Sequence, residues 1–302
     1  MGGRILLALT LPLELIALVV GIVRLVTASA LDREAARVRL RATLVTAACF
    51  VVVLAAVYFS PVPAEEDVRL ATLPAVAGLV GVVVAGLSEG LWRARRGPAR
   101  EASLRIRHDP GAESDRGLWR RYLLGLGVSA GMVVVGGATA AADGRSVARA
   151  WATGAASTGP YPGWTYGVPI AVALTLLAAA TWWALRQVDA RPVLDVERPA
   201  LDRALRTGSR VRVLRFAAGG TVLTAAGLAL SAGNSLAQLA QNLRMPGAPG
   251  GRAPWDWTQN AGFGLIGVAI ALILVAIQVL LWDAPAIPRA EAAADASREV
   301  SV

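Results

Sequence analysis

Seven long apolar runs constrain this chain more than any other feature of its sequence. A helix that crosses the hydrocarbon core of a bilayer needs roughly 20 mostly apolar residues. Strands would need turn signals about every ten residues, which these runs lack. The runs therefore predict an all-α, polytopic transmembrane helix bundle with seven spans. The predicted spans are Ile5–Val26, Thr43–Ser60, Leu70–Trp92, Tyr122–Ala142, Gly167–Trp183, Phe216–Asn234 and Gly262–Trp282.

The composition agrees with this class. Of the 302 residues, 55% are apolar and 17% are charged, whereas soluble domains carry about a quarter charged residues. A soluble enzyme is therefore disfavoured and intrinsic disorder is excluded. All 30 basic residues are arginine, which is typical of a GC-rich genome and leads us to expect a bacterial source. The lack of lysine excludes a retinal Schiff base.

The distribution of arginine predicts the orientation. The segments after spans one, three and five hold four, nine and eight arginines, and the C-terminal tail holds two more. Six arginines lie on the other side. Because loops rich in arginine stay in the cytoplasm, we expect the N-terminus outside and the C-terminus in the cytoplasm of a bacterial inner (cytoplasmic) membrane.

The chain leaves no room for a separate soluble domain. We expect a single transmembrane domain over residues 1–283, with basic cytoplasmic loops at 93–121 and 184–215, and a flexible cytoplasmic tail at 284–302. The second loop contains a candidate short helix from Pro199, with Gly208-Ser209 loosening the chain before span six. Cleavage after Ala28-Ser29-Ala30 is an alternative that would leave six spans, and the arginine pattern disfavours it.

The basic loops predict a lipid partner. Because the arginines cluster between apolar runs, they fit anionic lipids of the inner leaflet better than nucleic acid. A membrane or cytoplasmic protein partner is the alternative. Tryptophans at the inner ends of spans three, five and seven are the predicted interface anchors, although they also fit a repeat of two-helix hairpins. These anchors are Trp92, Trp182, Trp183 and Trp282.

Small residues predict close helix packing. Gly86 and Gly90 in span three, and Gly127 and Gly131 in span four, are spaced by four, which lets backbones approach in lipid. The second pair flanks Ser129 and imitates a nucleophile elbow. A serine nucleophile needs a neighbouring base, and the only histidine, His108, lies in a predicted loop. We therefore expect no catalytic residue.

Four polar residues within the spans form a candidate intramembrane site. They are Glu14, Arg24, Glu89 and Gln278. Polar groups inside a bilayer usually face the bundle or water, and those near a helix end can snorkel to the headgroups instead. Snorkelling is the alternative for Arg24 and Glu89, whereas Glu14 lies near the middle of span one. No cluster of metal-ligating residues occurs in the spans, so we expect no metal and no cofactor.

These features favour a multi-pass membrane protein that is associated with transport. It would be either a small permease or the membrane partner of a transporter, with no substrate indicated. The alternative is a non-transporting partner or sensor that acts through its basic cytoplasmic loops. An intramembrane enzyme is the third and weakest hypothesis, and we expect the chain not to be an enzyme.

Overall fold

The computed structural model describes five helices and one short hairpin. The described residues are 66–90, 113–151, 154–190, 199–242 and 256–280. The helices are α3 (Glu66–Gly90), α4 (Glu113–Thr139), α5 (Trp164–Ala190), α6 (Pro199–Asn242) and α7 (Asp256–Leu280), and the strands are β1 (Val147–Trp151) and β2 (Gly154–Thr158). Predicted spans one and two, with Glu14 and Arg24, lie outside the described residues.

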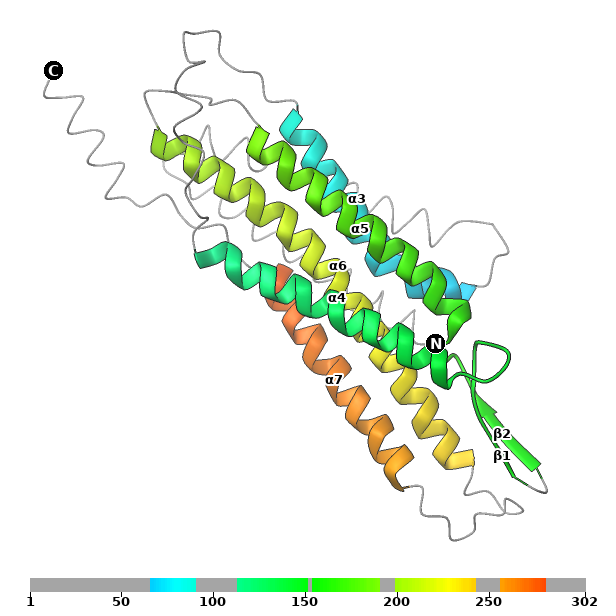
Figure 1. Ribbon diagram of the computed structural model, residues 1–302. Helices are drawn as coiled ribbons and strands as arrows, with labels where there is room; N and C mark the ends of the chain where they lie inside the picture. The colour runs from blue at the N-terminus through cyan, green and yellow to red at the C-terminus, as the bar shows by residue number, and fades with distance from the viewer. Residues whose placement is uncertain (1–65, 91–112, 152–153, 191–198, 243–255, 281–302) are drawn as a thin grey trace, which may run out of the picture.

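The five helices are each long and apolar enough to cross a membrane. They correspond to predicted spans three to seven, and all of them extend beyond those spans on at least one side. The chain reverses direction at each connection, so the helices run side by side in an elongated bundle (Figure 1). This part of the chain is therefore a bundle of candidate transmembrane helices, and the apolar runs predicted the presence and order of these five helices.

Helix α6 is the centre of this bundle. Of the residues in its most apolar stretch, 72% are buried, against 28–44% in the other four helices. It packs against α3, α4, α5 and α7, and α3 also packs along α5. At 1.5 Å per residue its 44 residues span about 66 Å, roughly twice the thickness of a hydrocarbon core.

The predicted break before span six is wrong. The structure has one continuous α6 from Pro199, a residue that suits a first helical position, and both Gly208 and Ser209 are buried within it. Residues 184–190, predicted as loop, are the last residues of α5. Burial against the neighbouring helices outweighs the weak helix propensity of glycine.

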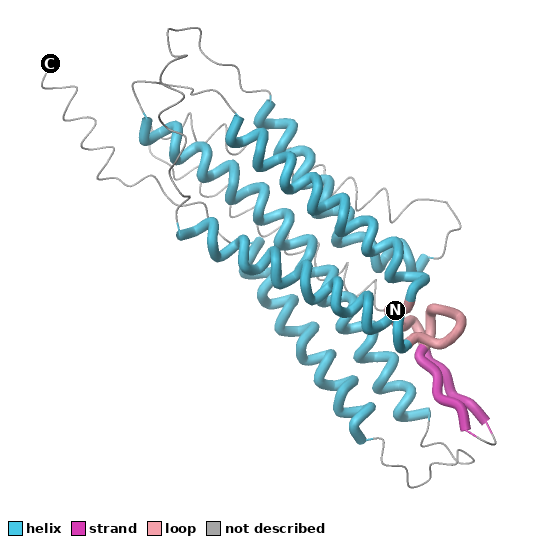
Figure 2. Tube along the Cα trace, viewed as in Figure 1, coloured by secondary structure: helices cyan, strands magenta, loops and turns pink. Residues whose placement is uncertain are grey.

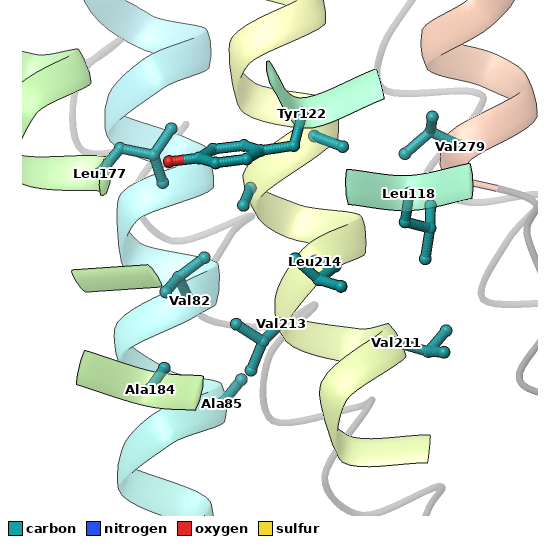
Figure 3. Close-up of a cluster of buried hydrophobic side chains, with 12 residues drawn as sticks. Val82, Ala85, Leu118, Tyr122, Leu177, Ala184, Val211, Val213, Leu214 and Val279 are labelled. Atoms are coloured by element: carbon teal, nitrogen blue, oxygen red, sulfur yellow. The ribbon is translucent and has the colours of Figure 1, made fainter. Parts of the chain in front are cut away.

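A cluster of buried side chains joins all five helices. It brings together residues such as Val82 of α3, Leu118 of α4, Leu177 of α5, Leu214 of α6 and Val279 of α7 (Figure 3). Valine, leucine and alanine dominate this cluster, and alanine lets the helix backbones come close. This cluster packs the five helices together at the end of the bundle where most of the arginines lie.

A β-hairpin that the sequence did not lead us to expect lies at the other end of the bundle, beside the end of α6 (Figure 2). Strands β1 and β2 pair antiparallel, with Val147 opposite Thr158 and Arg149 opposite Ala156. The turn that leads into β1 contains Gly144, whose φ of 63° lies in the left-handed region that favours glycine. Val147 and Thr158 are buried, so this face of the hairpin is directed at the bundle.

Candidate functional site

Most of the described charged residues lie at one end of the bundle. At this end α4 and α6 begin and α3, α5 and α7 end (Figure 1). We call it the Arg-rich end, and the opposite end the hairpin end. The arginines with described side chains at the Arg-rich end are Arg116, Arg120, Arg121, Arg186, Arg206, Arg210, Arg212 and Arg215. This asymmetry makes the Arg-rich end the candidate functional site.

Glu89 lies in the last turn of α3 and faces α6. Its side chain is 1% exposed, and its Oε1 lies 3.9 Å from Nη1 of Arg212, whose side chain is 14% exposed. A buried carboxylate is costly unless a cation or hydrogen-bond donors compensate it. Glu89 therefore does not snorkel away from the bundle, and it forms an ion pair that joins α3 to α6.

Gln278 makes a separate contact. Its Oε1 accepts a hydrogen bond of 3.1 Å from Nη2 of Arg121, which joins α7 to α4. Glu89 and Gln278 were predicted to share one polar site. The described residues instead give each of them a different arginine on a different helix, so they form two separate contacts.

Asp189 joins α5 to α6 at the same end. Its Oδ1 accepts hydrogen bonds from Nε and Nη2 of Arg210, at 3.2 and 2.6 Å. Arg206 donates to the backbone carbonyl of Asp189 at 3.3 Å. Sequence reasoning missed Asp189, Arg210 and Arg212 as paired residues, because their positions next to spans five and six suited contact with lipid headgroups equally well.

The two described tryptophan anchors, Trp182 and Trp183, have different surroundings. Trp182 is exposed, and the guanidinium of Arg186 lies 4.1 Å from its ring centroid, a cation–π arrangement suited to a membrane interface. Trp183 turns inward against Gly86, where an added Cβ would lie 2.5 Å from its ring. Trp92 and Trp282 lie outside the described residues, and Gly90 is the last residue of α3.

The packing predicted for Gly127 and Gly131 is not made by any described helix. A Cβ added at either position would meet nothing within 4 Å in the structure. The contact is formed by Gly125 instead, where a Cβ would lie 2.7 Å from Oγ1 of Thr221 and 2.8 Å from the backbone nitrogen of Val222. At about 100° per residue, Gly127 lies roughly 200° around the helix from Gly125. The spacing of Gly127 and Gly131 therefore identified the face of α4 that points away from α6.

Ser129 is part of the contact between α4 and α6. Its side chain is fully buried, and its hydroxyl donates to the carbonyl of Thr221 at 3.3 Å. The Thr221 hydroxyl in turn lies 3.4 Å from the carbonyl of Tyr122 and 3.0 Å from that of Ala217. Ser129 therefore contributes a hydrogen bond between helices, and His108 lies outside the described residues.

The hairpin end is held to α6 by side-chain hydrogen bonds. The hydroxyls of Ser231 and Ser235 both donate to the carbonyl of Pro160 at 2.7 Å. The Thr158 hydroxyl donates to the carbonyl of Ser235 at 2.7 Å. The two serine hydroxyls satisfy the carbonyl of Pro160, which lies in the loop after β2. Together with the Thr158 bond they hold the hairpin against the end of α6.

Asp143 organises the turn before the hairpin. The backbone N–H of Arg145 donates to its Oδ1 at 3.0 Å, and the hydroxyl of Ser146 donates to its Oδ2 at 2.8 Å. These bonds favour the carboxylate, so they hold the pKa of Asp143 below its usual range, with the Arg145 N–H contributing most.

We expect the hairpin to loosen when Ser231 and Ser235 are both replaced by alanine. The carbonyl of Pro160 then loses both donors, and each lost hydrogen bond costs about 1 kcal/mol. Hydrogen exchange of residues 147–158 should become about thirtyfold faster while that of α6 changes little. Ser157→Ala, on the exposed face of β2, is the control. Equal protection in all three proteins would show that these bonds do not hold the hairpin.

Among the described residues, no group of three or more His, Cys, Asp or Glu side chains is placed to hold a metal ion. Comparison with protein-family models, curated proteins and solved structures finds no match to this chain. The role of this chain must therefore be inferred from the geometry of the bundle.

Proposed function

We propose that this chain is a multi-pass protein of a bacterial inner membrane that works in a transport system as the membrane partner of a transporter. In this proposal the chain has seven spans, and its Arg-rich end lies in the cytoplasm. The arginine distribution supports the orientation, because positively charged residues are retained on the cytoplasmic side.

The single observation that carries the partner role is the tight packing of α6. Gly220 approaches Gly78 of α3 so closely that a Cβ on Gly78 would lie 2.9 Å from the Cα of Gly220. Gly233 approaches Gly262 of α7 in the same way, with a Cβ on Gly262 lying 2.8 Å from the Gly233 carbonyl oxygen. Contacts between backbones leave no space for a substrate between these helix pairs, which favours a structural scaffold over a permease.

The polar groups within the packed helices support the same role. The hydroxyls of Thr181 and Thr224 donate to backbone carbonyls one turn earlier in their own helices, each at 2.7 Å. Each hydroxyl has one proton, so a threonine that donates in this way has none left to donate to a substrate. Ser129 and Thr221 likewise bond to backbone carbonyls at the contact between α4 and α6.

The test is the composition of the particle that contains the chain in its own membrane. The tagged chain, expressed at its native level, would be extracted into native nanodiscs, and the particle mass and its subunits would be measured. We expect the 31.3 kDa chain in a fixed ratio with a transport subunit. A particle that holds this chain alone, with substrate flux in proteoliposomes made from it, would show that it is a permease and would overturn the partner role.

A sensor or other non-transporting partner is the second candidate. It is favoured by the exposed guanidiniums of Arg116, Arg120 and Arg186 at the Arg-rich end, which a cytoplasmic protein could contact. In the same experiment this candidate predicts a kinase or regulatory protein in the particle and no transport subunit.

A further inference from the structure

We propose that the exposed face of α4 binds one anionic phospholipid, with its phosphate at Arg116 and Arg120 and one acyl chain along Gly127 and Gly131. The proposal rests on the membrane placement in the proposed function and not on the transport role. It assigns a specific lipid site where the basic character of this end predicts only general attraction to anionic lipids.

Arg116 and Arg120 differ from the other arginines at the Arg-rich end. The others with described side chains interact with a carboxylate, an amide, a carbonyl, an aromatic ring or another group of the chain. These are Arg121, Arg186, Arg206, Arg210, Arg212 and Arg215. Within the described part of the chain, the guanidiniums of Arg116 and Arg120 are exposed and have no such interaction. They are therefore free to bind an anion.

The two arginines are one helical turn apart. Four residues correspond to a rise of about 6 Å, so both side chains lie on one side of α4. Two like charges at this spacing repel each other in the absence of an anion. A phosphate between them would relieve the repulsion and accept hydrogen bonds from both guanidiniums.

The apolar part of the site continues along the same face. At about 100° per residue, Leu123, Leu124, Gly127 and Gly131 lie within roughly 60° of the direction of Arg120. Leu123 is 56% exposed and Leu124 is 53% exposed. A Cβ at Gly127 or Gly131 would meet nothing within 4 Å, so the two glycines leave a shallow apolar surface beyond the leucines.

The length of this surface matches half a bilayer. From Arg120 to Gly131 the helix rises about 16 Å, and one leaflet of a core about 30 Å thick is about 15 Å deep. If the phosphate of a phospholipid lies at Arg120, its acyl chains therefore lie beside Gly127 and end near Gly131. Free phosphate would use only the first part of the site.

Charge favours a lipid over a second copy of the chain. Two parallel copies that met through this face of α4 would bring two Arg116 and two Arg120 side chains together, and like charges in contact oppose association. An anionic headgroup has the complementary charge and lies at the right depth.

The test compares the lipids that the full chain retains in native mass spectrometry. We expect the wild type, purified with equal amounts of phosphatidylglycerol and phosphatidylcholine, to keep one phosphatidylglycerol molecule preferentially. Arg116→Gln with Arg120→Gln should weaken this binding about ten- to thirtyfold, since each arginine near an anionic headgroup contributes about fivefold. Gly127→Leu should also weaken it while leaving both charges in place.

Arg145→Gln with Arg149→Gln removes the same charge at the hairpin end and should leave the preference unchanged. The proposal is overturned if the wild type shows no preference, or if the two double variants lose it equally. It is also overturned if inorganic phosphate competes with the lipid as well as a phospholipid does, because the acyl chain would then contribute nothing.

Cysteine cross-linking tests the other occupants of this face. The chain has one cysteine, Cys49, so Gly131→Cys gives two defined positions. The lipid site predicts no cross-link between Cys49 and position 131, and none between copies when Cys49 is replaced by serine. Efficient cross-linking of Cys49 to position 131 would place residues of predicted span two on this face. Efficient cross-linking between copies would place another copy of the chain there. Either result would overturn the proposal.

Discussion

Replacing Gly220 with leucine should prevent stable packing of α3 on α6. A Cβ at Gly220 would already lie 3.0 Å from the Cα of Gly78, 3.1 Å from the carbonyl oxygen of Pro74 and 3.3 Å from a methyl group of Leu177. Two of these three atoms belong to the backbone of α3, so they cannot rotate away. Overpacking a core costs about 1–3 kcal/mol when side chains can adjust, and we expect a larger loss here because the helices must separate.

Gly227→Leu is the matched control for this change. Gly227 lies two turns further along α6, on nearly the same side of the helix, yet a Cβ there would meet nothing within 4 Å. Both changes raise helix propensity by a similar amount. Thermal unfolding in detergent, followed by tryptophan fluorescence, should therefore show a large drop for Gly220→Leu and little change for Gly227→Leu. Similar stabilities for the two variants would contradict the close approach of α3 and α6.

Removing the Glu89 carboxylate should give the second large loss of stability. Glu89→Ala removes the carboxylate that lies 3.9 Å from Nη1 of Arg212, whose side chain is only 14% exposed. Removal of one member of a buried pair costs about 3–5 kcal/mol, mainly because the remaining charge stays buried. We expect Arg212→Ala to be destabilising for the same reason.

A double-mutant cycle separates the pair from the individual side chains. If Glu89 and Arg212 interact, the double alanine variant should be more stable than the sum of the two single losses predicts. The free energies of unfolding would be measured in one detergent at one pH. Losses that simply add would mean that the two residues act independently, and the ion pair would then not join α3 to α6.

The sequence predicted most of the positions of the helices along the chain. Runs of apolar residues such as Leu70–Trp92 and Gly262–Trp282 predicted α3 and α7 closely, because a membrane span has few alternative structures. Helix ends were less accurate. Hydropathy reports the part of a helix suited to lipid, whereas α6 continues through Arg206, Arg210 and Arg212 on the strength of its contacts with α3 and α5.

Contacts between helices were much harder to predict. The spacing of Gly127 and Gly131 is the usual sign of a packed face, but the same spacing also leaves an open surface, and only the position of α6 distinguishes the two. Gly125 and Ser129, which do contact α6, are also two small residues spaced by four, so this spacing occurs on two faces of α4. The partners of Glu89 and Gln278 were likewise missed, since pairing between distant segments depends on how the helices are rotated.

The hairpin was missed for a different reason. Its strands are short, and residues such as Ala148, Ala150 and Ala155 have little preference for β-structure. The two strands are held in place by hydrogen bonds to α6, which involve Thr158 and the carbonyl of Pro160. Such local structure is set by the tertiary contacts and not by the sequence of the segment.

The most direct test of this account asks on which sides of the membrane the two ends of the bundle lie. Ser157→Cys at the hairpin end and Ala190→Cys at the Arg-rich end, each exposed in the structure, would be made in the full chain with Cys49 replaced by serine. A membrane-impermeant maleimide should label position 157 in intact spheroplasts and position 190 only after the membrane is permeabilised. Labelling of position 190 in intact spheroplasts, or equal labelling of both positions, would contradict a membrane-spanning bundle with its Arg-rich end in the cytoplasm.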